Sequence, residues 1–298
     1  MRVFVLGNAA VDETFRLSSW PAPGRSVLGR VIKRDLGGKG ANQAVVLARA
    51  GIEVAFAAAI GTDAGGQWIE AQLACEGITG EHLLRLDAGT DRSVILVDEA
   101  GENATITTAD CTRVLGESAA AAFLKAAAPG DALVLQGNLS ADVTEAALRE
   151  ARTGGLLAIF NPSPVDPAFA ALWPLVDLAI VNRSEAAELT GLPDPEAASQ
   201  AMLTAGAGHV VVTLGAEGAF RHDAEGMVAV PAVPSDAVDT TGAGDTFAAV
   251  VTAQWLRAGR IGAPELAAAA AAAAITISRP GTYAAFPSQA ELAAILER

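Results

Sequence analysis

The sequence predicts an α/β protein in which a mostly parallel central sheet lies between two layers of helices. Short apolar runs alternate with helix-like stretches, most regularly after Glu117. Strands that are buried on both faces of a parallel sheet are continuous apolar runs, and Ala132–Gln136 and His209–Thr213 have this pattern. Hairpin-like regions in the N-terminal part do not fit the alternation, so we expect a small separate sheet there.

Glycines and prolines mark the ends of elements in the first third of the chain. Gly51 and Gly77 each follow a helix-like stretch, and Pro21, Pro23 and Gly24 interrupt regular structure. The expected elements are a strand at Val3–Leu6, an irregular stretch at Asp12–Arg34 with one strand at Val27–Lys33, a helix at Ala41–Ala50, a strand at Glu53–Ile60, a helix at Gly65–Glu76, and a hairpin of Ser93–Val97 and Ala104–Thr107 around Glu99–Glu102.

Strand and helix patterns continue to the C-terminus. The alanine run at Ala267–Ala274 is expected to be helical, because alanine has the highest intrinsic helix propensity. The expected strands are Ala132–Gln136, Leu156–Phe160, Leu178–Val181, His209–Thr213 and a hairpin of Ala219–His222 and Met227–Val230. The expected helices are Ser118–Ala127, Asp142–Arg152, Glu185–Thr190, Glu196–Ala205, Asp245–Arg257, Pro264–Ser278 and Gln289–Glu297.

Length and composition narrow the functional classes. The chain is long enough for one large α/β domain, and we expect residues 1–298 to form it. A formal net charge of −14 argues against binding to nucleic acid or to an anionic membrane. The two cysteines, Cys75 and Cys111, lie far apart and predict neither a disulfide framework nor a zinc site. Because a strand follows Met1 and Arg2 directly, we expect a cytoplasmic protein without a signal peptide.

The most informative segment is Asp239-Thr240-Thr241-Gly242-Ala243-Gly244-Asp245, which stands directly before an apolar, helix-compatible run. A helix N-terminus has unpaired N–H groups and a partial positive charge, so it attracts phosphate. The N–H groups of Gly242, Ala243 and Gly244 are therefore candidates for an anion hole, and Asp245 for the base that deprotonates a hydroxyl. The alternative interpretation is a glycine-rich loop with a helix-capping Asp.

A second motif, Gly37-Gly38-Lys39-Gly40-Ala41-Asn42-Gln43-Ala44, favours the first interpretation. The two strings resemble the two signatures of the ribokinase-like (PfkB-type) carbohydrate kinases, in that family's order. Asn182-Arg183-Ser184-Glu185 is similar to the family's Asn-x-x-Glu motif, and Thr213-Leu214-Gly215-Ala216-Glu217-Gly218 resembles its nucleotide-contacting turn. Neither a P-loop nor a dinucleotide fingerprint occurs.

The resemblance covers nearly the whole chain and implies the ribokinase-like fold, with a β-sheet lid built from residues approximately 12–36 and 90–110. It implies ATP-dependent phosphorylation of a primary hydroxyl of a small sugar, with Asp245 as the catalytic base. It also implies a homodimer that associates through the lid.

The nucleotide site follows from the same resemblance. Asn182 and Glu185 are implied to help hold Mg²⁺ and the ATP phosphates, Glu185 through water, and Thr213, Gly215 and Gly218 to line the nucleotide. From the residues alone, Asn182 and Glu185 also fit a helix N-cap with a first-turn acid. The turn that begins at Thr213 also fits an ordinary strand-to-hairpin connection.

The sugar is implied to contact Gly38, Lys39 and Asn42, and Asp12 is implied to accept hydrogen bonds from two vicinal hydroxyls. The residues alone allow a turn with a solvated Lys39 and a surface Asp12.

Two positions depart from the members of the family that use ribose. These members tend to carry Asn where this chain has Ala10, and Glu where it has Asn138, which we expect to contact the sugar. A buried hydroxyl left unpaired costs about 1–3 kcal/mol. The identity of the sugar therefore stays open. Two alternatives also stay open: a nucleoside kinase of the same fold, and a fructosamine- or ketose-type sugar kinase with a larger pocket.

A monovalent-cation site is a further implication of the resemblance, with K⁺ as the cation. Such a site would consist mostly of carbonyl oxygens, and a Ser of some relatives is replaced by Ala285. The matching positions are Asp239, Thr241, Thr276, Arg279 and Gly281. A third functional class is a sugar- or nucleotide-sensing regulator without activity, but a sensor has no need of Asp245 beside an intact anion hole.

Overall fold

The computed structural model describes residues 1–99 and 102–297. At its centre is a nine-stranded sheet in the order β13-β12-β11-β10-β9-β8-β1-β4-β5. Neighbouring strands from β5 to β11 pair in parallel, and β12 and β13 add an antiparallel hairpin at one edge. The strands are β1 (Val3–Leu6), β4 (Val54–Gly61), β5 (Leu83–Leu86), β8 (Ala132–Gln136), β9 (Leu157–Asn161), β10 (Leu178–Asn182), β11 (His209–Thr213), β12 (Ala219–Asp223) and β13 (Gly226–Val230).

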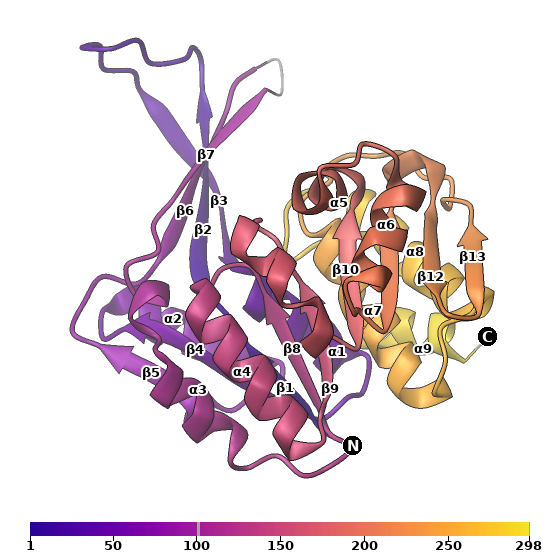
Figure 1. Ribbon diagram of the computed structural model, residues 1–298. Helices are drawn as coiled ribbons and strands as arrows, with labels where there is room; N and C mark the ends of the chain where they lie inside the picture. Colours follow the sequence, from indigo (N-terminus) through magenta and orange to yellow (C-terminus); the bar gives the residue numbers. More distant parts are fainter. Residues whose placement is uncertain (100–101, 298) are drawn as a thin grey trace.

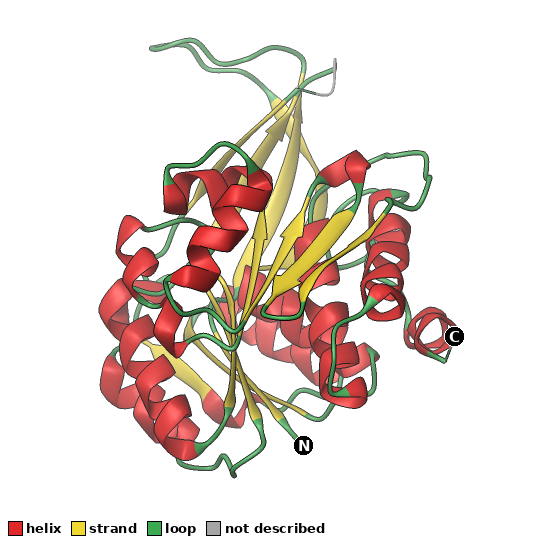
Figure 2. Ribbon diagram, turned by 45° about the vertical axis from the view of Figure 1, so that its right-hand side comes forward, coloured by secondary structure: helices red, strands yellow, loops and turns green. Residues whose placement is uncertain are grey.

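Helices cover both faces of this sheet (Figure 2). Side chains alternate between the faces along a strand, so Val3 and Val5 pack in one apolar core, and Phe4 and Leu6 in the other. The first core is closed by α1 (Lys39–Arg49), α2 (Ala64–Cys75), α7 (Ala243–Ala258), α8 (Ala263–Ile277) and α9 (Gln289–Leu296). The second is closed by α3 (Glu117–Leu124), α4 (Ala141–Gly154), α5 (Arg183–Thr190) and α6 (Pro195–Thr204).

Short 3₁₀ helices connect several elements. They are η1 (Gly80–His82), η2 (Thr112–Val114), η3 (Pro167–Ala171), η4 (Trp173–Leu175) and η5 (Gly215–Glu217). The predicted α/β fold with a mostly parallel sheet between two helical layers is confirmed. No helix in the described part of the chain combines the length and the apolar character that crossing a bilayer requires.

A second sheet projects from the larger one (Figure 1). Its strands are β2 (Ala10–Leu17), β3 (Gly29–Gly37), β6 (Arg92–Val97) and β7 (Asn103–Thr107), in the order β3-β2-β6-β7. The central pair, β2 and β6, is parallel, and each outer strand is antiparallel to its neighbour. We call this sheet the lid. The expected lid sheet is therefore present.

Two features of the N-terminal part differ from the sequence prediction. The stretch from Asp12 was expected to be irregular, but β2 occupies Ala10–Leu17. Asp and Glu in this segment have low strand propensity, and pairing with β3 and β6 supplies the hydrogen bonds that fix the strand. The short strand β5 was not predicted. The turn of the predicted hairpin at residues 100–101 lies outside the described residues.

Candidate active site

The residues predicted to form an anion hole lie at the N-terminus of α7. Gly242 is the N-cap with φ of 78°, and a Cβ there would lie 2.7 Å from Phe286 Cε1 and 3.1 Å from Thr282 Cγ2. Only glycine fits this turn, since a side chain would be strained in backbone and in space. Within residues 1–99 and 102–297, the N–H groups of Gly242 and Gly244 have no hydrogen-bond partner, whereas that of Ala243 donates to a carbonyl at 3.3 Å.

Asp245 lies in the first turn of α7 with only 3% of its surface exposed. Residues from the start of α1 surround its carboxylate. Asn42 Nδ2 donates to Oδ2 at 2.8 Å, Gln43 Nε2 donates to Oδ1 at 3.1 Å, and Lys39 Nζ lies 3.6 Å from Oδ1. The two sequence motifs, about two hundred residues apart, thus meet at one carboxylate. Gly38, the residue before α1, is its N-cap.

Buried amide side chains form a hydrogen-bonded network with Gln43. Gln43 Oε1 accepts from Gln136 Nε2 at 2.9 Å, and Gln43 Nε2 also donates to Asn161 Oδ1 at 3.2 Å. Asn161 Nδ2 in turn donates to the Ile180 carbonyl at 2.8 Å. Sequence reasoning did not single out these side chains. A signal was available, because Gln136 and Asn161 are polar residues at the ends of otherwise apolar strands.

Asp12 stands on the lid strand β2, opposite Asp35 of β3. Burial, together with the negative charges of Asp35 and Asp245, raises the pKa of Asp12 to about 6, against the lowering effect of a hydrogen bond from Ser93. The expected surface-turn alternative for Asp12 is therefore excluded, because only 9% of the residue is exposed.

Three of the predicted sugar-binding residues carry a buried oxygen that has no hydrogen-bond partner among the described residues. These oxygens are Asp12 Oδ1, Asn42 Oδ1 and Asn138 Oδ1. Asn138 follows β8, which pairs in parallel with β1, and Asp12 lies on β2, the strand that follows β1 in the chain. Buried acceptors normally have a partner. The three oxygens therefore form an acceptor set suited to hydroxyl donors.

A cavity of about 500 Å³ borders the N-terminus of α7. Its lining includes the predicted nucleotide residues Thr213, Gly215 and Gly218 together with Ala243 and Gly244. Most of its remaining lining is apolar and comes from Ala232, Val233, Pro234, Phe247, Ala270, Ala273, Ala274 and Ile277. Such a lining suits the flat face of a base. Two separately predicted groups of residues thus share one cavity.

Asn182 and Glu185 form a capping box at the start of α5. Asn182 Oδ1 accepts from the Glu185 N–H, and Glu185 Oε2 accepts from the Asn182 N–H, both at 2.9 Å. Asn182 is next to Thr213 across the β10–β11 pair, which places the box at the same edge of the sheet as the cavity. Among the described residues, the capping box uses only Oε2 of the Glu185 carboxylate as acceptor. One carboxylate oxygen thus stays available for water around a metal ion.

The residues matched to a cation site are only partly together. Gly281 N–H donates to Asp239 Oδ2 at 2.9 Å, and Thr241 N–H donates to Asp239 Oδ1 at 3.0 Å. The Thr276 hydroxyl instead contacts Thr246, and the Arg279 side chain pairs with Glu291. The K⁺ assignment stays a prediction.

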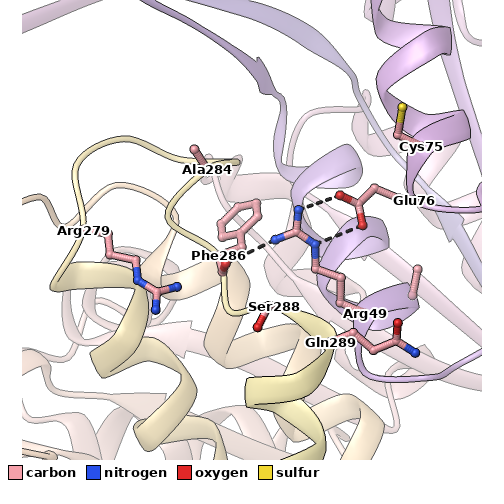
Figure 3. Close-up of a pocket in the computed structure, with 9 residues that line it drawn as sticks. Arg49, Cys75, Glu76, Arg279, Ala284, Phe286, Ser288 and Gln289 are labelled. Atoms are coloured by element: carbon pink, nitrogen blue, oxygen red, sulfur yellow. Dashed lines mark hydrogen bonds and ion pairs between the residues drawn. The ribbon is translucent and has the colours of Figure 1, made fainter.

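Arg279 also lines a different cavity, of about 580 Å³, near the C-terminal end of α1 (Figure 3). There Arg49 forms an ion pair with Glu76 and donates to the Phe286 carbonyl, as Figure 3 shows. Phe286, which lines this cavity, also packs against the Gly242 turn at the start of α7.

A family model described as pfkB family carbohydrate kinase matches residues 2–289. The chain is 31% identical to a ribokinase of Haemophilus influenzae, covering 98% of this chain and 97% of that protein. It is 31% identical to a ribokinase of Mus musculus over 97% of this chain and 93% of the other. It is 26% identical to a deoxyribokinase of Salmonella typhi over 97% and 96% of the two chains.

Solved structures match along the full length. The ribokinase of Thermotoga maritima superposes with a TM-score of 0.87 at 26% identity, covering 100% of both chains. The ribokinase of Arabidopsis thaliana, solved with ribose and ATP, superposes with a TM-score of 0.88 at 23% identity over 100% of this chain and 99% of the other. At that identity the second likeness concerns the fold alone.

Proposed function

Because the chain belongs to the pfkB family of carbohydrate kinases, we propose that it transfers the γ-phosphoryl group of ATP to a primary hydroxyl of ribose or a closely related sugar. Membership of the family makes it a phosphotransferase with an alcohol group as acceptor. One observation carries the finer proposal: the buried Asp245 carboxylate directly follows Gly244, which lines a nucleotide-sized cavity, and accepts a hydrogen bond from Asn42, whose own oxygen is an unpartnered acceptor.

Asp245 acts as the base in this proposal. Its position in the first turn of α7 puts it next to the free amides of Gly242 and Gly244. The carboxylate orients the sugar hydroxyl and takes its proton, while the amides stabilise charge on the phosphoryl group. Lys39 Nζ, 3.6 Å from Oδ1, offsets the negative charge of the carboxylate. Asn42 and Gln43 fix the carboxylate and keep it from rotating.

ATP and Mg²⁺ fit the residues at this site. Thr213, Gly215 and Gly218 would hold the nucleoside part of ATP, and Gly244 would contact the phosphates. Among the described residues no group of three or more His, Cys, Asp or Glu could hold a metal ion. Mg²⁺ needs few protein carboxylates because it keeps several waters, and Glu185 would bind one of these waters. The bound metal offsets the charge of the phosphates.

The substrate proposal rests on hydrogen-bond complementarity. Asp12, Asn42 and Asn138 offer acceptor oxygens, which a polyol with several hydroxyl donors would satisfy. The relatives of highest identity named above are ribokinases, and a deoxyribokinase also matches along the full length. Ribose and deoxyribose are therefore the first sugars to test.

The test is a substrate panel with the purified protein, ATP and Mg²⁺. ADP release is measured with ribose, deoxyribose, fructose and adenosine at equal concentrations. We expect turnover of at least one pentose with a kcat/KM ten or more times that of adenosine. Turnover of adenosine alone would replace the sugar by a nucleoside as substrate, and turnover of none of the four would contradict the proposal.

We also propose a homodimer that associates through the lid. The outer strands β3 and β7 carry exposed apolar side chains, with Val31 56% and Ile106 65% exposed, and Leu28 just before β3 is 94% exposed. Edge strands with exposed apolar residues favour association with another chain. A second copy of the same lid would cover these side chains.

A further inference from the structure

Lys33 joins the lid to the C-terminal part of the chain. It lies on β3, and its Nζ is 2.7 Å from Asp35 Oδ2 and donates to the Pro280 carbonyl at 2.9 Å. Pro280 belongs to residues 278–288, the segment between α8 and α9, which we call the connector. A Cβ at Gly281 would overlap Lys33 Nζ, so the absence of a side chain at Gly281 leaves room for the ammonium group.

The connector in turn supports the anion hole. Gly281 N–H donates to Asp239 Oδ2 at 2.9 Å, while Asp239 Oδ1 accepts the Thr241 N–H at 3.0 Å, directly before Gly242. Thr282 N–H donates to Asp35 Oδ2 at 3.2 Å. Two carboxylates, one from the lid and one from the anion-hole loop, therefore hold consecutive amides of the connector.

The charges in this region need a cation. Asp35 is 7% exposed, and its carboxylate lies in the same lid pair as Asp12, whose pKa is already raised by burial and by neighbouring negative charge. Burial raises the pKa of Asp239 as well, but hydrogen bonds from Thr241 and Gly281 and the charge of Lys33 outweigh it and keep the pKa below its usual value. Lys33 thus offsets the charge of two carboxylates that lie on different parts of the chain.

We propose that Lys33 is a positioning residue of the phosphoryl transfer: its ammonium group fastens the lid strand β3 to the connector and thereby sets the geometry of the anion hole. The proposal rests on the proposed function, because the anion hole matters only if a phosphoryl group passes through it. Lys33 touches neither Asp245 nor the anion-hole amides, and it acts through Asp35, Pro280 and Gly281.

Removal of the ammonium group leaves Asp35 and the Pro280 carbonyl without their shared donor. The connector then keeps only the Thr282–Asp35 hydrogen bond to β3. The hydrogen bonds that run from Gly281 through Asp239 to Thr241 therefore start from a connector that is held less firmly. The Gly242 turn packs on Thr282 and Phe286 of the same connector, so its amides shift from their position. A small displacement of the stabilising donors is enough to slow phosphoryl transfer.

The experiment compares Lys33→Ala, Lys33→Met and Arg30→Ala in the full-length protein. Lys33→Ala leaves a space beside Asp35 and Pro280 that a small cation can enter, whereas Lys33→Met fills it with an uncharged chain of similar length. Arg30 is an exposed basic residue on the same strand, so its replacement controls for loss of charge on the lid. We expect both Lys33 variants to lose at least tenfold in kcat, and Arg30→Ala to stay within twofold of the wild type.

Ammonium or methylammonium ions at 10–100 mM should restore kcat of Lys33→Ala several-fold at constant ionic strength. These ions should not restore kcat of Lys33→Met, and they should not raise kcat of the wild type. The bulky tetramethylammonium ion should leave kcat of all three proteins unchanged. An unchanged kcat in Lys33→Ala overturns the proposal, and so does a loss that methylammonium leaves unrestored, because Lys33 then serves stability alone.

A second measurement separates this inference from the kinase proposal. Hydrogen exchange of the ligand-free protein needs no substrate, and the Gly281 and Thr282 amides should exchange faster in Lys33→Met than in the wild type. If the wild type phosphorylates no sugar, the proposed function fails. The hydrogen-exchange comparison still shows whether Lys33 holds the connector. Equal exchange at both amides in the two proteins overturns the role of Lys33.

Discussion

Replacement of Asp245 by Asn separates the chemical role of the carboxylate from its structural role. In the wild type the two carboxylate oxygens accept from Asn42 and Gln43. In Asp245→Asn one oxygen becomes an NH₂ group that meets the Asn42 amide. Asn42 Oδ1 has no partner among the described residues, so a 180° turn of this amide gives the new donor an acceptor.

The magnitudes of the two effects differ. Two charge-assisted hydrogen bonds become neutral ones, a loss of about 1 kcal/mol each, and the variant no longer has to bury a charge at a site that is 3% exposed. The free energy of unfolding should therefore change by less than about 2 kcal/mol. Loss of a general base lowers kcat by about 10²–10⁴-fold. The loss in catalysis should thus far exceed the loss in stability.

The assay measures ADP release at saturating sugar and ATP, together with Tm and with calorimetric binding of both ligands. Asp142→Asn is the matched control, because Asp142 is an exposed acid in the first turn of another helix, α4, and is not one of the proposed site residues. We expect the control to keep full activity, and Asp245→Asn to bind both ligands and turn over at least a hundredfold more slowly. Turnover within a few-fold of the wild type would show that another group takes the proton.

Three other predictions follow from the same geometry. Asp12→Asn should raise Tm at pH 8 but not at pH 4, and it should raise the KM for sugar. Because the pKa of Asp12 in the folded protein is about 6, the stability due to Asp12 is present below pH 3.8 and is lost as pH rises through 6. An equal Tm gain at both pH values would contradict this. Gly242→Ala should lower the free energy of unfolding by about 1–2 kcal/mol for the backbone strain and further for the overlap with Phe286. The control is Gly259→Ala, because Gly259 has φ of 69° but open space around it, and equal losses of Tm in the two variants would rule out the overlap. Val31→Lys should shift a lid dimer to monomer in light scattering, and a wild-type monomer would reject the dimer.

The order of elements could be predicted from the sequence because most strands are continuous apolar runs. β8 and β11 begin and end at the predicted residues, since apolar character stops at Gln136 and Thr213. β2 could not be predicted, because Asp12 and Glu13 interrupt any strand pattern. Its stability comes from pairing with β6, which lies about eighty residues later in the chain.

The candidate site, too, could be predicted from the sequence only in part. A local pattern, glycines before an apolar helix, indicated the N-terminus of α7 and its Asp245, and the resemblance to a family supplied the residues of α1. Neither source could place Gln43 between Asp245 and the amides of Gln136 and Asn161, because that contact needs the order of β8 and β9 in the sheet. The roles proposed for the individual site residues stay predictions until the variants are measured.

The parallel pairing of β2 with β6 has a consequence for the order in which the chain folds. Val11 pairs with Arg92, and the intervening segment contains β3, α1, β4, α2 and β5. Closing so long a loop costs conformational entropy that only the contacts of the intervening helices and strands can offset. A nascent chain therefore completes the lid sheet only after three of the nine strands of the large sheet, β1, β4 and β5, have been synthesised. Asp12 is thus one of the last residues of the N-terminal part to reach its final surroundings.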